Sequence, residues 1–171
     1  MNKYNTTPRS QGGAALLVVL MLLLIMTLLG LASLRVSMLE ERMTAGLLDR
    51  SLGFQGAEAA LREAEAFLLT RPTFPTAGCS AGLCAQPVAT ATERWLDPNF
   101  GGWRTATVSL GGPALAPQYI IESMGDAPNS PGCDQQIPVP ASCVSPRFRI
   151  TARSAAAGRA QVTLQSNFTA L

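Results

Sequence analysis

AALLVVLMLLLIMTLLGLASL, residues 14–34, is a run of 21 residues that carries no charge. As an α-helix with a rise of 1.5 Å per residue, it would extend roughly 31 Å, about the thickness of the hydrocarbon layer of a bilayer. We therefore expect residues 14–34 to form the membrane-spanning half of a helix, and the chain to be anchored by this single segment.

The charges on either side of the run predict its orientation. Lys3 and Arg9 precede it without any acidic residue, whereas Arg35 is followed closely by Glu40 and Glu41. Basic residues favour the cytoplasmic side, so we expect residues 1–13 in the cytoplasm and the rest of the chain in the periplasm. The alternative is a cleaved secretory signal peptide. The run is longer than the usual apolar region of such a peptide, and the helical pattern continues beyond it.

The stretch 35–70 predicts an exposed continuation of the same helix. No proline follows the apolar run before Pro72, and strong helix formers dominate between them. A helix over residues 14–70 would be roughly 85 Å long. Seven apolar residues recur at helical spacing and predict one packing face for a globular head: Met43, Leu47, Phe54, Ala57, Leu61, Ala64 and Leu68.

The region 71–171 is predicted to be a head of loops and strands. Its composition shifts to Pro, Gly, Ser, Thr and Ala, with short apolar alternations that indicate strands with one buried face. The expected strands are Trp103–Leu110, Tyr119–Met124, Arg147–Arg153 and Gln161–Phe168. We expect an α+β fold in which residues 35–70 pack on a small antiparallel sheet. The long loops 72–95 and 125–146 are candidate binding surfaces.

The cysteines of the head indicate an oxidising compartment. Cys79, Cys84, Cys133 and Cys143 all follow the apolar run. An even number in an exported region predicts two disulfides, although three pairings of four cysteines remain open. A zinc site of four cysteines is the alternative, but the spacing lacks the two short paired motifs of structural zinc sites.

Composition argues against most enzyme and nucleic-acid functions. The chain has no histidine, which removes the commonest general base and metal ligand, and its net charge of +2 is scattered. We expect no cofactor, metal or catalytic residue. An alternative is an anchored periplasmic hydrolase or binding protein that uses a carboxylate pair or a calcium site. Its candidate residues would be Glu93, Asp97, Glu122, Asp126 and Asp134, which follow no calcium-loop pattern.

Three further stretches carry a resemblance to a known family. They are the pair Gly12 and Gly13 before the apolar run, LEERM from Leu39, and DRSLGFQGAEAALR from Asp49. Together with the apolar helix, they make roughly the first 70 residues resemble the N-terminal region of PilX-type minor pilins of type IV pili.

The resemblance implies a processing site and a set of partners. A prepilin peptidase would remove residues 1–13 on the cytoplasmic side by cutting after Gly13, with Gly12 as the other candidate, and would methylate Ala14. The chain would then leave the inner membrane for a cell-surface pilus. Its implied partners are other minor pilins and the major pilin through the helix, and a tip adhesin. The implied function is pilus assembly in support of twitching motility and adhesion.

The sequence departs from the common pilin pattern at one position. Most pilins carry a glutamate at the fifth mature residue, which here is Val18, or Leu17 if the cut follows Gly12. The first acidic residue is Glu40. This absence is consistent with a priming or tip subunit, or with a sparse subunit in which the pairing is dispensable. A minor pseudopilin of type II secretion also fits, although its tip subunit carries a large inserted domain for which 71–171 leaves no room.

Overall fold

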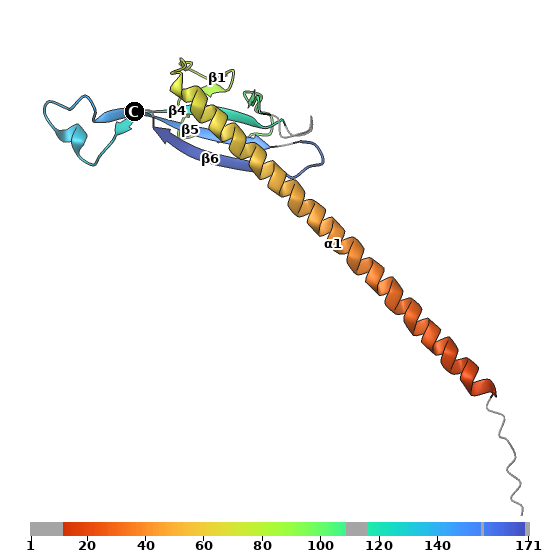
Figure 1. The fold of residues 1–171 in the computed structure, drawn as a ribbon. Helices are drawn as coiled ribbons and strands as arrows, with labels where there is room; N and C mark the ends of the chain where they lie inside the picture. The colour runs from red at the N-terminus through yellow and green to blue at the C-terminus, as the bar shows by residue number, and fades with distance from the viewer. Residues whose placement is uncertain (1–11, 109–115, 155, 170–171) are drawn as a thin grey trace, which may run out of the picture. The chain divides into compact units, whose positions relative to one another are not determined.

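The computed structural model describes residues 12–108, 116–154 and 156–169. The chain divides into two compact units, Met1–Ala45 and Gly46–Leu171. The helix α1 (Gly12–Leu69) contributes its first part to one unit and its second part to the other (Figure 1).

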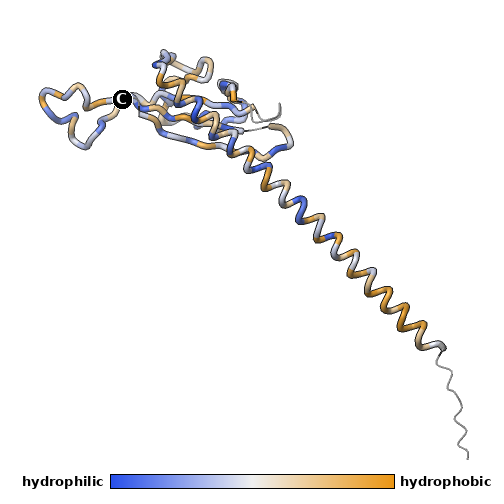
Figure 2. Tube along the Cα trace, viewed as in Figure 1, coloured by the Kyte–Doolittle hydropathy of each residue, from blue (hydrophilic) through white to orange (hydrophobic). Residues whose placement is uncertain are grey.

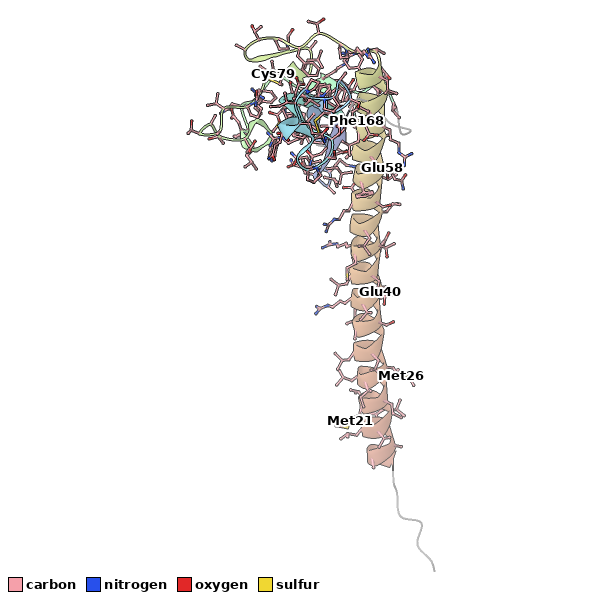
Figure 3. All side chains as sticks on the ribbon, turned by 90° about the vertical axis from the view of Figure 1, so that its left-hand side faces the viewer. Met21, Met26, Glu40, Glu58, Cys79 and Phe168 are labelled. Atoms are coloured by element: carbon pink, nitrogen blue, oxygen red, sulfur yellow. A yellow bond between two sulfur atoms is a disulfide. The ribbon has the colours of Figure 1, made fainter. Side chains whose placement is uncertain are left out.

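The described part of the first unit, residues 12–45, is a helical segment without an internal core. Its large apolar side chains are exposed all round, and Figure 3 shows the sticks of Met21 and Met26 standing out from the helix. The hydropathy colouring in Figure 2 marks this part of α1 as predominantly hydrophobic. The hydroxyls of Thr27 and Ser37 donate to the carbonyls of Leu24 and Ser33 within the helix. The segment is long and apolar enough to cross a membrane. Thr27 lies within the apolar run 14–34, and its bond leaves no unpaired hydroxyl there.

The helix ends where its sequence can no longer extend it. Pro72 cannot donate a backbone hydrogen bond and restricts the residue before it. Two backbone hydrogen bonds close the final turn, from Thr70 to the Phe67 carbonyl and from Arg71 to the Leu68 carbonyl. Arg71 has a φ of 54°, which is the left-handed conformation that often ends a helix. The chain thereby turns back toward the sheet.

A six-stranded sheet forms the centre of the second unit, with the order β1-β2-β4-β5-β6 and with β3 paired to β4 (Figure 1). Its long strands form an antiparallel meander. The strands are β1 (Cys79–Ser80), β2 (Leu83–Cys84), β3 (Arg104–Thr105), β4 (Gln118–Pro128), β5 (Val144–Ser154) and β6 (Val162–Thr169). Two short 3-10 helices, η1 (Arg94–Leu96) and η2 (Cys133–Gln135), lie in the loops.

The predicted α+β class is confirmed, with one correction to the sheet. Three of the expected strands correspond to β4, β5 and β6. The fourth is reduced to β3, and its expected end at Leu110 lies outside the described residues. The sheet is mixed rather than purely antiparallel because Leu83 and Cys84 of β2 pair in parallel with Ile121 and Glu122 of β4. A parallel pairing needs a long crossover, which the chain between β2 and β4 supplies.

The core lies between α1 and one face of the sheet. Alternate residues of β5 point to this face, so Ile150 and Ala152 are buried together with Ile121 of β4. Ala60, Ala64 and Leu68 of α1 complete the cluster, which Phe148 and Phe168 flank. Small helix residues opposite branched strand residues allow the helix backbone to approach the sheet closely.

Candidate functional site

The predicted processing residues lie at the start of α1. Gly13 and Ala14 are helical and exposed, and a Cβ added at Gly13 would meet nothing within 4 Å. Packing in this chain therefore gives no reason for glycine at position 13. Residues 1–11 of the predicted leader lie outside the described residues, so the cut remains an expectation.

The buried face of α1 differs from the predicted one. Ala57, Ala64 and Leu68 are buried and Leu61 is half-buried, as a packing face requires. The remaining three are exposed, Met43 by 69%, Leu47 by 68% and Phe54 by 48%. The described part of the head leaves Leu47 and Phe54 exposed, and Met43 belongs to the first unit.

Small residues explain the difference. The buried positions of α1 in the second unit are Gly53, Gly56, Ala57, Ala60, Ala64 and Leu68. This face is turned by roughly 70° around the helix from the predicted stripe, at 100° per residue. An ideal Cβ on Gly53 would lie 3.1 Å from Cγ2 of Val162 and 3.3 Å from the carbonyl oxygen of Ala160. The helical spacing of these small residues is the sequence signal for this face, and the pattern of large apolar residues does not reveal it.

Three acidic side chains fasten α1 to different parts of the sheet. Asp49 binds the turn between β5 and β6, where the N–H of Ala160 donates to it at 2.6 Å. Glu63 accepts hydrogen bonds from the backbone N–H and the hydroxyl of Thr107 at 2.7 and 2.8 Å. The Ser166 hydroxyl donates to Glu65 at 3.3 Å. The helix is therefore anchored to the strand β6 on one flank and to the segment after β3 on the other.

A buried charge network holds η1 on the opposite face of the sheet. Glu122 of β4 is fully buried and pairs with Arg94 at 2.5 Å and with Arg149 at 2.8 Å. Arg149 also reaches Glu93 at 2.8 Å, and its guanidinium lies 4.2 Å from the centre of the Trp95 ring. Because two guanidiniums surround one buried carboxylate, its charge is compensated and its hydrogen bonds are satisfied.

The other candidate carboxylates do not gather into a site. Asp97 accepts a hydrogen bond from the backbone of Asn99, and both Asp126 and Asp134 are exposed. Within residues 12–108, 116–154 and 156–169, no group of three or more histidine, cysteine or acidic residues is placed to hold a metal ion. Glu93 and Glu122 come together only through Arg149, which is the arrangement of a structural ion pair.

The four cysteines form two local disulfides. Cys79 is bonded to Cys84, where it closes the β1–β2 hairpin, and Cys133 is bonded to Cys143. The second bridge closes a loop between β4 and β5 that exposes Ile137 by 99%. Asn129 fixes the base of this loop by donating to the Ser142 carbonyl and the Ser145 hydroxyl. Both predicted long loops are thus tied at one point by a disulfide.

An exposed apolar helix, continued into a disulfide-bonded α+β head, defines the pilin class of filament subunits. The family model described as PilX N-terminal matches residues 11–62, and the model described as Type IV pilus assembly protein PilX C-term matches residues 70–170. The chain belongs to this PilX family of type IV pilus assembly proteins. Searches of curated proteins and of solved structures found no match.

The family fixes the general role of the chain. It takes part in type IV pilus assembly as a structural component that associates with other pilus components. With its apolar N-terminal helix, it is a membrane-anchored pilus protein. The resemblance of roughly the first 70 residues is therefore confirmed, and the matches extend it over the head.

Proposed function

We propose that the chain is a minor pilin that acts in a priming or tip complex of the type IV pilus. The observation that carries this proposal is the absence of any carboxylate between Ala14 and Glu40, in a chain that belongs to the PilX family. A buried intramembrane carboxylate is costly unless a partner neutralises it. A subunit that lacks one cannot pair with the N-terminal ammonium of a neighbour, as a repeated shaft subunit would.

The exposed apolar surface of α1 supports assembly through the helix. Leu47 and Phe54 are exposed beside the head, and Met43 is exposed in the first unit. Large patches of exposed apolar side chains are rare on soluble monomers, and they mark surfaces that contact a protein or a membrane. We propose that the apolar part of α1 meets the inner membrane before assembly, and meets the helices of other minor pilins and of the major pilin afterwards.

We propose that the N-terminus is cytoplasmic and the head periplasmic. The basic residues before the apolar run and the two disulfides after it agree on this orientation. The proposed parts are a leader at 1–13, a membrane-spanning half at 14–34, an exposed half at 35–70 and a head at 71–171. A tip adhesin would meet the head, and the assembled pilus would support twitching motility and adhesion.

The mass of the N-terminal peptide of the purified chain tests the processing step. We expect a peptide that begins at methylated Ala14, or one residue earlier if the cut follows Gly12. A chain that keeps Met1 in assembled pili would contradict the prepilin assignment.

The position in the filament needs a second experiment. A photoreactive residue at Val18 should crosslink to other minor pilins, and mass spectrometry of sheared pili should find the chain far below the major pilin in amount. Crosslinks mainly to the major pilin, at a constant ratio along fractionated filaments, would rule out the tip position.

A further inference from the structure

The outer edge of β6 lacks the features that usually protect an edge strand. Its sequence, VTLQSNFT from Val162 to Thr169, contains no charge, proline or glycine. The register with β5 runs without a bulge from Ser154 opposite Val162 to Arg147 opposite Thr169. Natural edge strands are commonly short, bulged, charged or interrupted by proline, because unpaired backbone groups recruit other strands.

No described residue occupies this edge. Among residues 12–108, 116–154 and 156–169, the strand pairing of β6 is to β5 alone, and no loop donates to or accepts from its backbone. The edges of β1 and β3 are only two residues long. The β6 edge therefore offers the longest row of backbone donors and acceptors that the described sheet leaves open.

One flank of α1 adjoins the same edge. Gly53 packs against Val162, and Glu65 bonds Ser166, so this part of the helix runs alongside β6. Phe54, Leu61 and Glu65 are spaced by seven and four residues and share the flank on the β6 side. The opposite flank carries Glu63, which binds Thr107 after β3.

This flank is apolar but only partly covered. Phe54 is exposed and Leu61 is half-buried, although both belong to the stripe that the sequence predicts as a packing face. A strand added to β6 would place alternate side chains on the helix side of the sheet, next to Phe54 and Leu61. The same occupant would satisfy the open backbone edge and cover the exposed apolar flank.

We propose that β6 accepts an extended segment of a second protein as an additional strand of the sheet. Glu65 lies on this surface, and its described partner is the neutral Ser166 hydroxyl, so the segment should carry a lysine or arginine among apolar residues on its helix side. The segment of β6 itself carries no basic residue, which disfavours pairing of two copies edge to edge.

Photocrosslinking of the full chain in piliated cells tests the proposal. A benzophenone amino acid replaces Asn167 on the exposed face of β6 in one variant and Phe54 in another, and Thr163 serves as a second strand position. Mass spectrometry then sequences the crosslinked peptides. We expect Asn167 and Phe54 to capture one and the same short segment, alternately apolar and containing a basic residue.

A control position and a charge reversal sharpen the result. The same probe at the exposed Val88, in the loop before η1, should not capture that segment. Glu65→Lys should lower its crosslinking yield at Asn167 by about tenfold, whereas Asp134→Lys, the same change on the Cys133–Cys143 loop, should leave it unchanged.

Three results would overturn the proposal. They are different segments captured at the two positions, a second copy of β6 at Asn167, and no segment captured on the strand at either position. Capture of a neighbour's N-terminal helix at Phe54, with no segment captured at Asn167 or Thr163, belongs to the third of these. It would still agree with the proposed pilin function, so the two ideas can fail separately.

Discussion

Asp49 of α1 binds Ala160, a residue 111 positions later, by accepting a hydrogen bond of 2.6 Å from its backbone N–H. The same carboxylate lies 2.5 Å from the guanidinium of Arg159. The turn between β5 and β6 is therefore held on the helix at the first residues of the second unit. Below this point, toward the N-terminus, α1 is exposed all round, so Asp49 marks where the head begins to pack on the helix.

Asp49→Ala should destabilise the head by about 2 kcal/mol, because the charged hydrogen bond to the Ala160 N–H is lost. Arg159→Ala should cost less than about 1 kcal/mol, because that ion pair is partly exposed to water. Thermal unfolding of the full chain in detergent, followed by near-ultraviolet circular dichroism, measures both. An equal loss in the two variants would contradict the role assigned to the backbone bond.

Gly53→Ala and Gly46→Ala form a matched pair. Both replace a helical glycine by a better helix former, which alone is worth about 1 kcal/mol. Gly46 has open space around it, so its replacement should stabilise the chain by roughly that amount. At Gly53 the new methyl group would press on Val162 and on the Ala160 carbonyl, so we expect a net loss of about 1 kcal/mol. Denaturant unfolding that gives both variants the same gain would show that the helix can move away from the hairpin.

Glu122→Gln should destabilise the head by about 3 kcal/mol, because it leaves the guanidiniums of Arg94 and Arg149 without their buried counter-charge. Exchange of the backbone amides of η1 with deuterium should also become faster. Glu58→Gln is the control, since its ion pair with Arg62 is exposed on the helix surface. Comparable effects of the two changes would mean that burial does not matter at Glu122.

Ionisation of Tyr119 should destabilise the folded chain at alkaline pH. Burial raises the pKa of its hydroxyl above the ordinary value of 10.0. The unfolded chain therefore releases this proton at a lower pH than the folded chain does. The contribution of Tyr119 to the free energy of unfolding should therefore stay constant below pH 10 and should fall as the pH rises from there toward the folded pKa.

Tyr119→Phe should remove this part of the alkaline loss, while the wild type keeps it. The comparison is simple because few other groups titrate at this pH. The chain has one other tyrosine, Tyr4, and a single lysine, Lys3, and both precede the described residues. Urea unfolding at pH 8 and at about pH 10.5 measures the difference. Parallel curves for the two proteins would indicate that Tyr119 reaches water when the head is folded.

Local sequence patterns are enough to predict the apolar anchor, the class of fold and the three long strands. Each of these features depends on a local pattern. The length of the uncharged run 14–34 can be counted without reference to any other part of the chain, and the alternation of apolar and polar residues in 147–153 and 161–168 indicates strands with one buried face. The local cysteine pairs were among the pairings that sequence left open, and only the fold selected Cys79 with Cys84 and Cys133 with Cys143.

The side of α1 that faces the sheet depends on tertiary contacts. The large residues Leu47 and Phe54 suggested one face, but the sheet packs on Gly53, Ala57, Ala60 and Ala64. The periodicity of apolar residues along a helix does not encode how closely a sheet can approach the helix backbone. In this chain the close approach depends on contacts with residues about 100 positions away, such as Val162. The parallel pairing of β2 with β4 and the bonds of Asp49 and Glu122 are equally long-range, and no local pattern encodes them.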